Sequence, residues 1–182
     1  MSAADLLRDV VHALDDAGIP HMIVGSFAST SYGAPRATQD IDIVIDPTAE
    51  ALDAFVASFD TDTIYLSPTS ARAALATRDQ FNLVDIATGW KVDLIIRKDR
   101  PFSRSEFARR ARVRLLDVDV YRASAEDTVL AKLEWAASGG SDRQLVDAAT
   151  VLSVGAGALD DDYLDHWAAE LGVSDLLARA RG

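Results

Sequence analysis

Apolar residues recur along this chain with two spacings, one typical of helices and one typical of strands. Leucine and valine recur at helical spacing near the start and Gly18 follows them, which predicts a helix over residues 3–17. The same spacing predicts helices over 27–33, 48–58, 125–137, 141–153, 160–171 and 174–180, and one after Pro68. Short apolar runs predict strands at 21–24, at 40–45 and near Ile64, a hairpin over 81–98 that turns at Thr88-Gly89, and further strands within 114–124.

The order of these elements predicts a mixed α/β (α+β) fold, in which a mixed sheet is flanked by helices and followed by a helical C-terminal part. We expect an α/β core over residues 1–122 and a helical region over residues 123–182 packed on it. The chain has 182 residues, of which 49% are hydrophobic and 26% charged. These values are typical of one globular domain with a small appended part.

Two carboxylates interrupt an apolar run that otherwise reads as a buried strand. In the stretch DIDIVI, residues 40–45, isoleucine alternates with polar or smaller residues, so Asp40 and Asp42 share one face of the strand. Residues two apart lie roughly 6.5–7 Å from each other on a strand, so the two carboxylates can converge on one ion. Either they face solvent on an edge strand, or a positive charge lies between them, because neighbouring buried carboxylates repel.

A third acid lies in another apolar strand, where WKVDLII places Asp93 between Val92 and Leu94. If this strand lies next to residues 40–45, three carboxylates meet. Ligation by oxygen alone, without His or Cys, suits Mg²⁺ or Mn²⁺. Two such ions about 4 Å apart are a common device for in-line attack on a phosphate.

Charge is unevenly distributed along the chain. The net charge is −11, which opposes non-specific binding of nucleic acid. Residues 97–114 nevertheless carry eight Arg or Lys against Asp99 and Glu106, a local charge of +6. This basic segment is either a solvated loop and helix face or a docking stripe for an anionic partner such as RNA or a protein.

Several classes of protein are excluded by composition. The chain has no cysteine, which excludes disulfides, thiolate metal sites and a cysteine nucleophile. It has no apolar run near 18 residues, and its first residues are acidic and amphipathic, unlike a signal peptide. We therefore expect a cytoplasmic protein that does not contact the membrane.

A Gly-Ser pair precedes the first two carboxylates by about 15 residues, at the end of a predicted strand. Gly25 permits a close approach of the backbone to another group. Ser26 opens a short predicted helix, whose free N–H groups favour an anion. Strand, Gly-Ser, helix, loop and the acidic strand thus form one ordered set.

This set resembles the signature of nucleotidyltransferases of the DNA polymerase β superfamily, in which Gly-Gly or Gly-Ser and a short helix precede Arg-x-Thr/Ser-x-Asp-hydrophobic-Asp. The matching residues here are Gly25-Ser26 and the stretch YGAPRATQDID, which contains Arg36, Thr38 and the two carboxylates. The resemblance spans roughly residues 20–150. It is greatest to bacterial toxin-type members, the AbiEii-like and minimal nucleotidyltransferase families.

The resemblance implies roles for the carboxylates. Asp40 and Asp42 would hold the metal that binds the β- and γ-phosphates of a nucleoside triphosphate. Asp42 and Asp93 would hold a second metal near the attacking hydroxyl, and Asp93 would accept that hydroxyl's proton.

Further residues would serve the triphosphate. Gly25, Ser26 and nearby N–H groups would cradle it, Lys132 would neutralise its charge, and Arg36 and Thr38 would orient phosphates or brace the loop. The alternative for Arg36 is a surface arginine, and that for Lys132 is an exposed helix lysine beside Glu134. A downstream pair, Arg143 and Asp147, also fits toxin-type members, although we expect Asp147 to pair with Arg143 in a structural role.

The expected function is Mg²⁺-dependent transfer of a nucleoside monophosphate from an NTP to an acceptor hydroxyl on tRNA, a protein or a small molecule such as an aminoglycoside. The resemblance suggests a toxin with a cognate antitoxin. The alternative is a catalytically silent nucleotidyltransferase-like module that binds a nucleotide or a partner protein.

Overall fold

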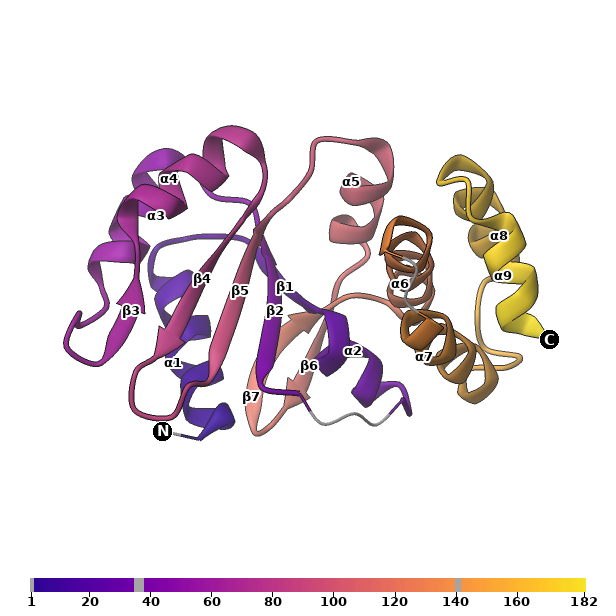
Figure 1. Cartoon of the computed structure of the whole chain (residues 1–182), viewed down its shortest axis with the longest axis horizontal. Helices are drawn as coiled ribbons and strands as arrows, with labels where there is room; N and C mark the ends of the chain where they lie inside the picture. Colours follow the sequence, from indigo (N-terminus) through magenta and orange to yellow (C-terminus); the bar gives the residue numbers. More distant parts are fainter. Residues whose placement is uncertain (1, 35–37, 140–141) are drawn as a thin grey trace.

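The computed structural model describes residues 2–34, 38–139 and 142–182 of the chain. Strands and helices alternate in the first two thirds, and four helices complete the described chain (Figure 1). In chain order the elements are α1 (Ala3–Asp16), β1 (His21–Val24), α2 (Gly25–Ser31), β2 (Asp40–Ile45), α3 (Ala49–Ala57), β3 (Ile64–Leu66), α4 (Pro68–Thr77), β4 (Gln80–Asp85), β5 (Lys91–Ile96), α5 (Pro101–Ala108), β6 (Ala111–Leu115), β7 (Val118–Arg122), α6 (Ala125–Gly139), α7 (Asp142–Val154), α8 (Asp161–Glu170) and α9 (Ser174–Arg181).

The strands form a mixed sheet in the order β3-β4-β5-β2-β1-β7-β6. The hairpin predicted over 81–98 is confirmed as the antiparallel pair β4–β5. Strand β5 also pairs in parallel with β2, which in turn pairs antiparallel with β1. The two acidic strands are therefore neighbours in the middle of the sheet.

The two faces of the central strands have different neighbours. Ile41, Ile43 and Ile45 of β2 are fully buried in a core that also holds apolar residues of α1, α3 and α4. The alternate residues of β2, including Asp40 and Asp42, point to the opposite face. One face of the strand thus anchors the fold and the other is available for chemistry.

The predicted element boundaries hold with a few differences. Helix α2 begins at Gly25, two residues earlier than predicted, and strand β6 begins at Ala111 inside the basic segment. The predicted start of a helix at residue 141 lies outside the described residues, and α7 is described from Asp142. Within the described ranges, no helix has the length and apolar character needed to cross a bilayer.

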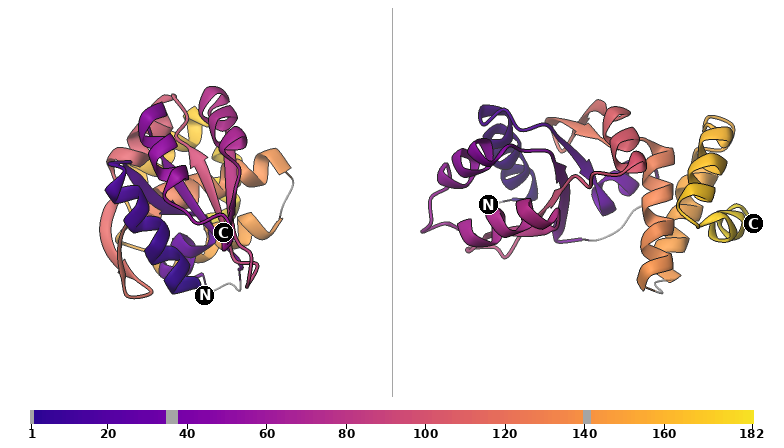
Figure 2. Two further views of the ribbon diagram at one scale, coloured as in Figure 1. Left: turned by 90° about the vertical axis from the view of Figure 1, so that its left-hand side faces the viewer. Right: turned by 90° about the horizontal axis from the view of Figure 1, so that it is seen from above.

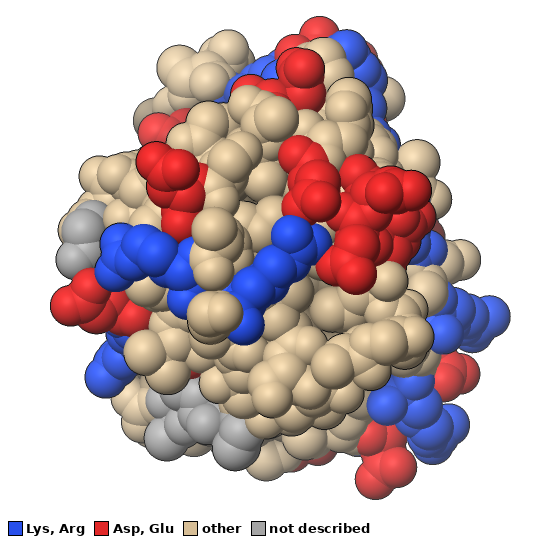
Figure 3. Space-filling view, turned by 90° about the vertical axis from the view of Figure 1, so that its right-hand side faces the viewer, with Lys and Arg blue, Asp and Glu red and all other residues tan. Residues whose placement is uncertain are grey.

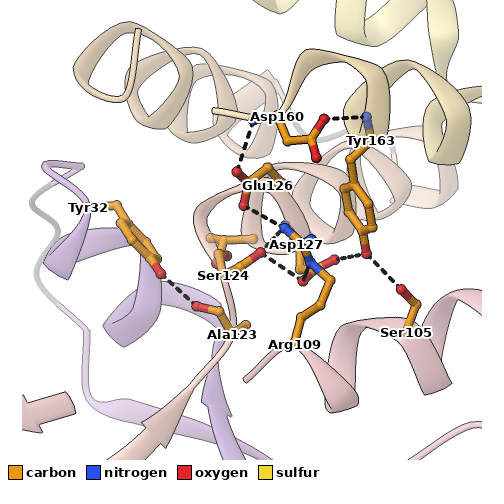
Figure 4. Close-up of polar contacts among 10 residues, drawn as sticks. Tyr32, Ser105, Arg109, Ala123, Ser124, Glu126, Asp127, Asp160 and Tyr163 are labelled. Carbon is orange, nitrogen blue, oxygen red and sulfur yellow. Dashed lines mark hydrogen bonds and ion pairs between the residues drawn. The ribbon is translucent and has the colours of Figure 1, made fainter. Parts of the chain in front are cut away.

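The C-terminal helices form a second core beside the sheet, with apolar residues from α6 to α9 (Figure 2). A polar network joins this core to the first two thirds of the chain (Figure 4). The Tyr163 hydroxyl on α8 donates to Asp127 Oδ1 on α6 at 2.6 Å and lies 3.0 Å from Ser105 Oγ on α5. Arg109 lies over the Tyr163 ring at 3.8 Å and donates to Glu126 and Asp127.

Candidate active site

The parallel register of β2 and β5 brings the predicted carboxylates together. Asp42 lies directly opposite Asp93, and Asp40 lies directly opposite Lys91. Because Asp40 and Asp42 are two residues apart, as are Lys91 and Asp93, all four side chains share one face of the sheet. The adjacency that the sequence analysis required for three carboxylates to meet is confirmed.

Gly25 allows Asp42 to approach the start of α2. A Cβ atom at residue 25 would overlap Asp42 Oδ2, and the backbone there has φ +62°, a conformation that favours glycine. Asp42 accepts a hydrogen bond from the Ser26 backbone N–H. One of the N–H groups at the start of α2 is therefore already used by the protein's own carboxylate, and the expected cradle for an anion at this helix stays a prediction.

The surroundings of Asp42 disfavour its ionised form. Burial, together with the negative charge of Asp93, raises the pKa of Asp42 to about 6. The Ser26 N–H and the Lys91 ammonium partly offset that rise. A cation that binds next to such a carboxylate stabilises its ionised form and lowers its pKa.

Lys91 lies between the other two carboxylates. Its Nζ is 3.0 Å from Asp93 Oδ2 and 3.4 Å from Asp40 Oδ1. The second oxygen, Asp93 Oδ1, is buried and accepts no hydrogen bond from any described residue. Among residues 2–34, 38–139 and 142–182, no three acidic or histidine side chains are grouped closely enough to hold a metal ion as they stand.

A cleft of about 350 Å³ opens above this face of the sheet. Its floor includes Asp40, Asp42 and Asp93, and its walls come from α2, α5 and α6. Gly25, Ser26, Thr38 and Lys132, all singled out in the sequence, line the same cleft. The structure thus brings together every predicted site residue that it describes.

Lys132 is buried rather than exposed beside Glu134. Its Nζ donates to Asp147 Oδ2 at 2.8 Å and to Gln144 Oε1 at 3.1 Å. The expected structural role of Asp147 is supported by this ion pair, although its partner here is Lys132 rather than the predicted Arg143. Helices α6 and α7 are therefore joined at the edge of the cleft.

The loop before β2 is only partly described, because Arg36 lies outside the described residues. Thr38 Oγ1 accepts from the Asp40 backbone N–H at 3.1 Å and lies 3.2 Å from the Asp40 carbonyl oxygen, to which it donates. These contacts support the bracing role expected for Thr38, since they fix the backbone at the start of the acidic strand.

Sequence analysis missed the contribution of α5 to the lining of the cleft. Glu106 on α5 is buried there, and burial together with the charge of Asp127 raises its pKa to about 8. Nearby, Arg100 makes a bidentate ion pair with Glu134 and donates to Ser103 at 3.0 Å. In the sequence, Glu106 was visible only as an acidic residue within the basic segment.

Most cations of the basic segment form ion pairs with carboxylates of the same protein. Six of its eight cations lie within ion-pair distance of a carboxylate, among them Arg97 with Asp46 and Arg104 with Asp99. On the end of the molecule formed by the C-terminal helices, basic and acidic side chains lie next to one another (Figure 3). The interpretation of residues 97–114 as a docking stripe for an anionic partner is weakened accordingly.

Solved nucleotidyltransferase structures share this fold. The crystal structure of ANT(2'')-Ia in complex with adenylyl-2''-tobramycin is 12% identical, with a TM-score of 0.59 over 94% of this chain and 98% of that one. An antigenic nucleotidyltransferase-like protein from Paracoccidioides brasiliensis is 17% identical, with a TM-score of 0.59 over 98% and 91% of the two chains. The sequence matches no family model and no curated protein. The chain therefore has a nucleotidyltransferase-type mixed α/β fold, as the sequence predicted.

Proposed function

We propose that this protein transfers a nucleoside monophosphate from an NTP to an acceptor hydroxyl and releases pyrophosphate. The observation that carries this proposal is the group Asp40, Asp42 and Asp93 on two adjacent parallel strands, at the floor of a cleft of about 350 Å³. In the reaction a bond forms between the acceptor oxygen and the α-phosphorus, and the bond from that phosphorus to the pyrophosphate breaks.

The donor set at the floor of the cleft fits Mg²⁺ or Mn²⁺. All three side chains offer carboxylate oxygens, which these hard cations prefer, and the buried Asp93 Oδ1 accepts no hydrogen bond within the described chain. Asp40 and Asp42 would hold the ion on the triphosphate side, and Asp42 and Asp93 the ion on the acceptor side. When bound, such ions neutralise phosphate charge and lower the pKa of an oxygen nucleophile.

The chain's own side chains supply the remaining parts of the reaction. Asp93 would accept the proton of the acceptor hydroxyl, a general-base role. The Ser26 hydroxyl would contact the triphosphate, and Thr38 would hold the start of β2 in place. The two hydrogen bonds of Lys132 leave one of its three N–H donors for a phosphate oxygen.

A small hydroxylated molecule fits the cleft best as the acceptor. The cleft is lined by carboxylates as well as cations, and most of the basic segment is already paired with acids. Both features disfavour a long anionic acceptor such as tRNA. Among the structural neighbours, ANT(2'')-Ia is described as an antibiotic-resistance factor and was solved with adenylyl-2''-tobramycin.

A catalytically silent nucleotide-binding module is the second candidate. The position of Lys91 favours it, since an internal ammonium already compensates two of the three carboxylates. The AbiEii-like toxin role and its antitoxin partner stay predictions based on the sequence resemblance.

The transfer assay tests the proposal directly. The purified protein is incubated with each α-³²P-labelled NTP, Mg²⁺ or Mn²⁺, and in separate reactions with an aminoglycoside mixture, total RNA or total protein. We expect label on a small molecule, and its loss in Asp42→Asn. The matched control is Asp119→Asn on the β6–β7 hairpin, away from the cleft. Absence of label from every acceptor, together with retained NTP binding, would favour the silent module.

A further inference from the structure

Lys91 provides a positive charge among the carboxylates, one of the two alternatives for Asp40 and Asp42, although it lies between Asp40 and Asp93. It lies in register with Asp40 and on the same sheet face as Asp93, and its ammonium contacts one oxygen of each. Burial alone does not hold the side chain there, because 31% of it is exposed. The ammonium is thus held mainly by charge and can leave without breaking the core.

The Lys91 ammonium compensates the charge of the carboxylates, as a bound divalent cation would. Lys91 neutralises two of the carboxylates that would hold a metal, through Asp40 Oδ1 and Asp93 Oδ2. It also offsets part of the mutual repulsion of the acids, since its charge lowers the pKa of Asp42 against the effects of Asp93 and Asp40. Two cations sharing these oxygens would repel each other.

We propose that Lys91 is the counter-ion of these carboxylates in the metal-free protein and competes with the divalent metal for Asp40 and Asp93. This inference rests on the proposed function, because it presumes that the carboxylates bind metal. Lys91 is a positioning residue in this scheme: it keeps the acids together and compensated while the cleft is empty, and it moves away when metal loads. The nucleotide-free protein therefore binds metal weakly, and metal enters together with the triphosphate, whose negative charge offsets the displaced ammonium.

Manganese binding to the nucleotide-free protein tests the competition without any turnover. The free Mn²⁺ signal is followed by electron paramagnetic resonance during titration of the wild type, Lys91→Met and Lys91→Arg. Removing a unit charge about 4 Å from a divalent ion is expected to change its affinity by at least about tenfold, since the Coulomb energy exceeds that of a tenfold change even at the dielectric constant of water. We therefore expect Lys91→Met to bind Mn²⁺ at least about tenfold more tightly, and Lys91→Arg to bind like the wild type because it keeps the charge.

Lys98→Met is the matched control, because Lys98 lines the same cleft and makes no ion pair with Asp40, Asp42 or Asp93 in the described structure. We expect it to change the Mn²⁺ affinity by less than about threefold. A thermal melt without metal, recorded for each variant, establishes that the titrated protein is folded.

The outcomes separate this inference from the proposed function. Unchanged or weaker Mn²⁺ binding by folded Lys91→Met, with Asp42-dependent transfer intact in the wild type, would overturn the role of Lys91 alone. An equal gain in Lys98→Met would also overturn it, since the effect would then be general to the cleft. Absence of Mn²⁺ binding in all proteins, together with absence of transfer, would overturn both proposals.

Discussion

Replacing Glu106 by Gln is expected to remove a large part of the pH dependence of stability. Glu106 is buried at the cleft wall, and burial, followed by the charges of Asp127 and Glu134, raises its pKa to about 8 from an ordinary value of 4.5, although Arg100 and Lys98 lower it. A carboxyl group with a raised pKa in the folded state keeps its proton there after the unfolded chain has lost it. The folded state is therefore favoured fully below pH 4.5 and loses that advantage as the pH rises to about 8.

The magnitude follows from the difference between the two pKa values. Each unit is worth about 1.4 kcal/mol, so ionised Glu106 costs up to about 5 kcal/mol of folding free energy. Relaxation and water entry reduce such costs for buried charges, and we expect about 2–4 kcal/mol. For a chain of this length, that corresponds to roughly 5–10 °C in melting temperature.

The assay is a melting curve by circular dichroism at pH 4, below both pKa values, and at pH 9, above both. The wild type should lose roughly 5–10 °C more between these two values than Glu106→Gln does. Glu170→Gln, which changes an exposed residue on α8, should follow the wild type. An equal loss in the wild type and in Glu106→Gln would refute the reasoning, because it would mean that Glu106 does not titrate in this range.

Three further substitutions test the floor of the cleft and the junction between the cores. Asp42→Asn should reduce transfer by roughly 10³-fold while the melting temperature is kept or raised, because a buried charge next to Asp93 is removed; labelled-NTP transfer and a melting curve measure the two effects. Gly25→Ala should cost about 3 kcal/mol in urea unfolding, since its methyl group would overlap Asp42 Oδ2 at a positive φ. Tyr163→Phe should cost about 1–3 kcal/mol in the same measurement, because Asp127 would lose a buried donor.

Each of these three has a matched control. Asp119→Asn should transfer like the wild type. Gly18 also has a positive φ, +66°, but a Cβ there would meet no atom within 4 Å, so Gly18→Ala should cost only about 1–2 kcal/mol. Tyr65→Phe, at a tyrosine that is 62% exposed, should change stability by less than about 0.5 kcal/mol. If Gly18→Ala were as costly as Gly25→Ala, the predicted overlap with Asp42 would not explain the loss.

The central strands were predictable because their two faces have different neighbours. The alternation of isoleucine and aspartate in residues 40–45 is visible in the sequence, and so is the hairpin that carries Asp93. The parallel pairing of these two strands could not be predicted, because the paired residues lie 51 positions apart in the chain and their pairing is set by the fold as a whole.

The partners of the charged residues were less predictable. Lys132 was assigned to phosphate or to solvent, and its pairing with Asp147 depends on how α6 packs against α7. Lys91 occurs two residues before Asp93, and the period of a strand could have placed both on one face, but only the register showed that Asp40 lies opposite. Glu106 was visible in the sequence only as a charge, and its burial could not be predicted because it depends on contacts with other parts of the fold.

The cleft lies where two separate hydrophobic cores meet. Its acidic floor is supported by the core beneath the sheet, whereas its α6 wall belongs to the core of the C-terminal helices. Side chains on that wall can be exchanged without disturbing the packing that aligns β2 with β5. Substitutions on that wall can thus alter the shape and charge of the cleft while the register that places Asp42 beside Asp93 is kept.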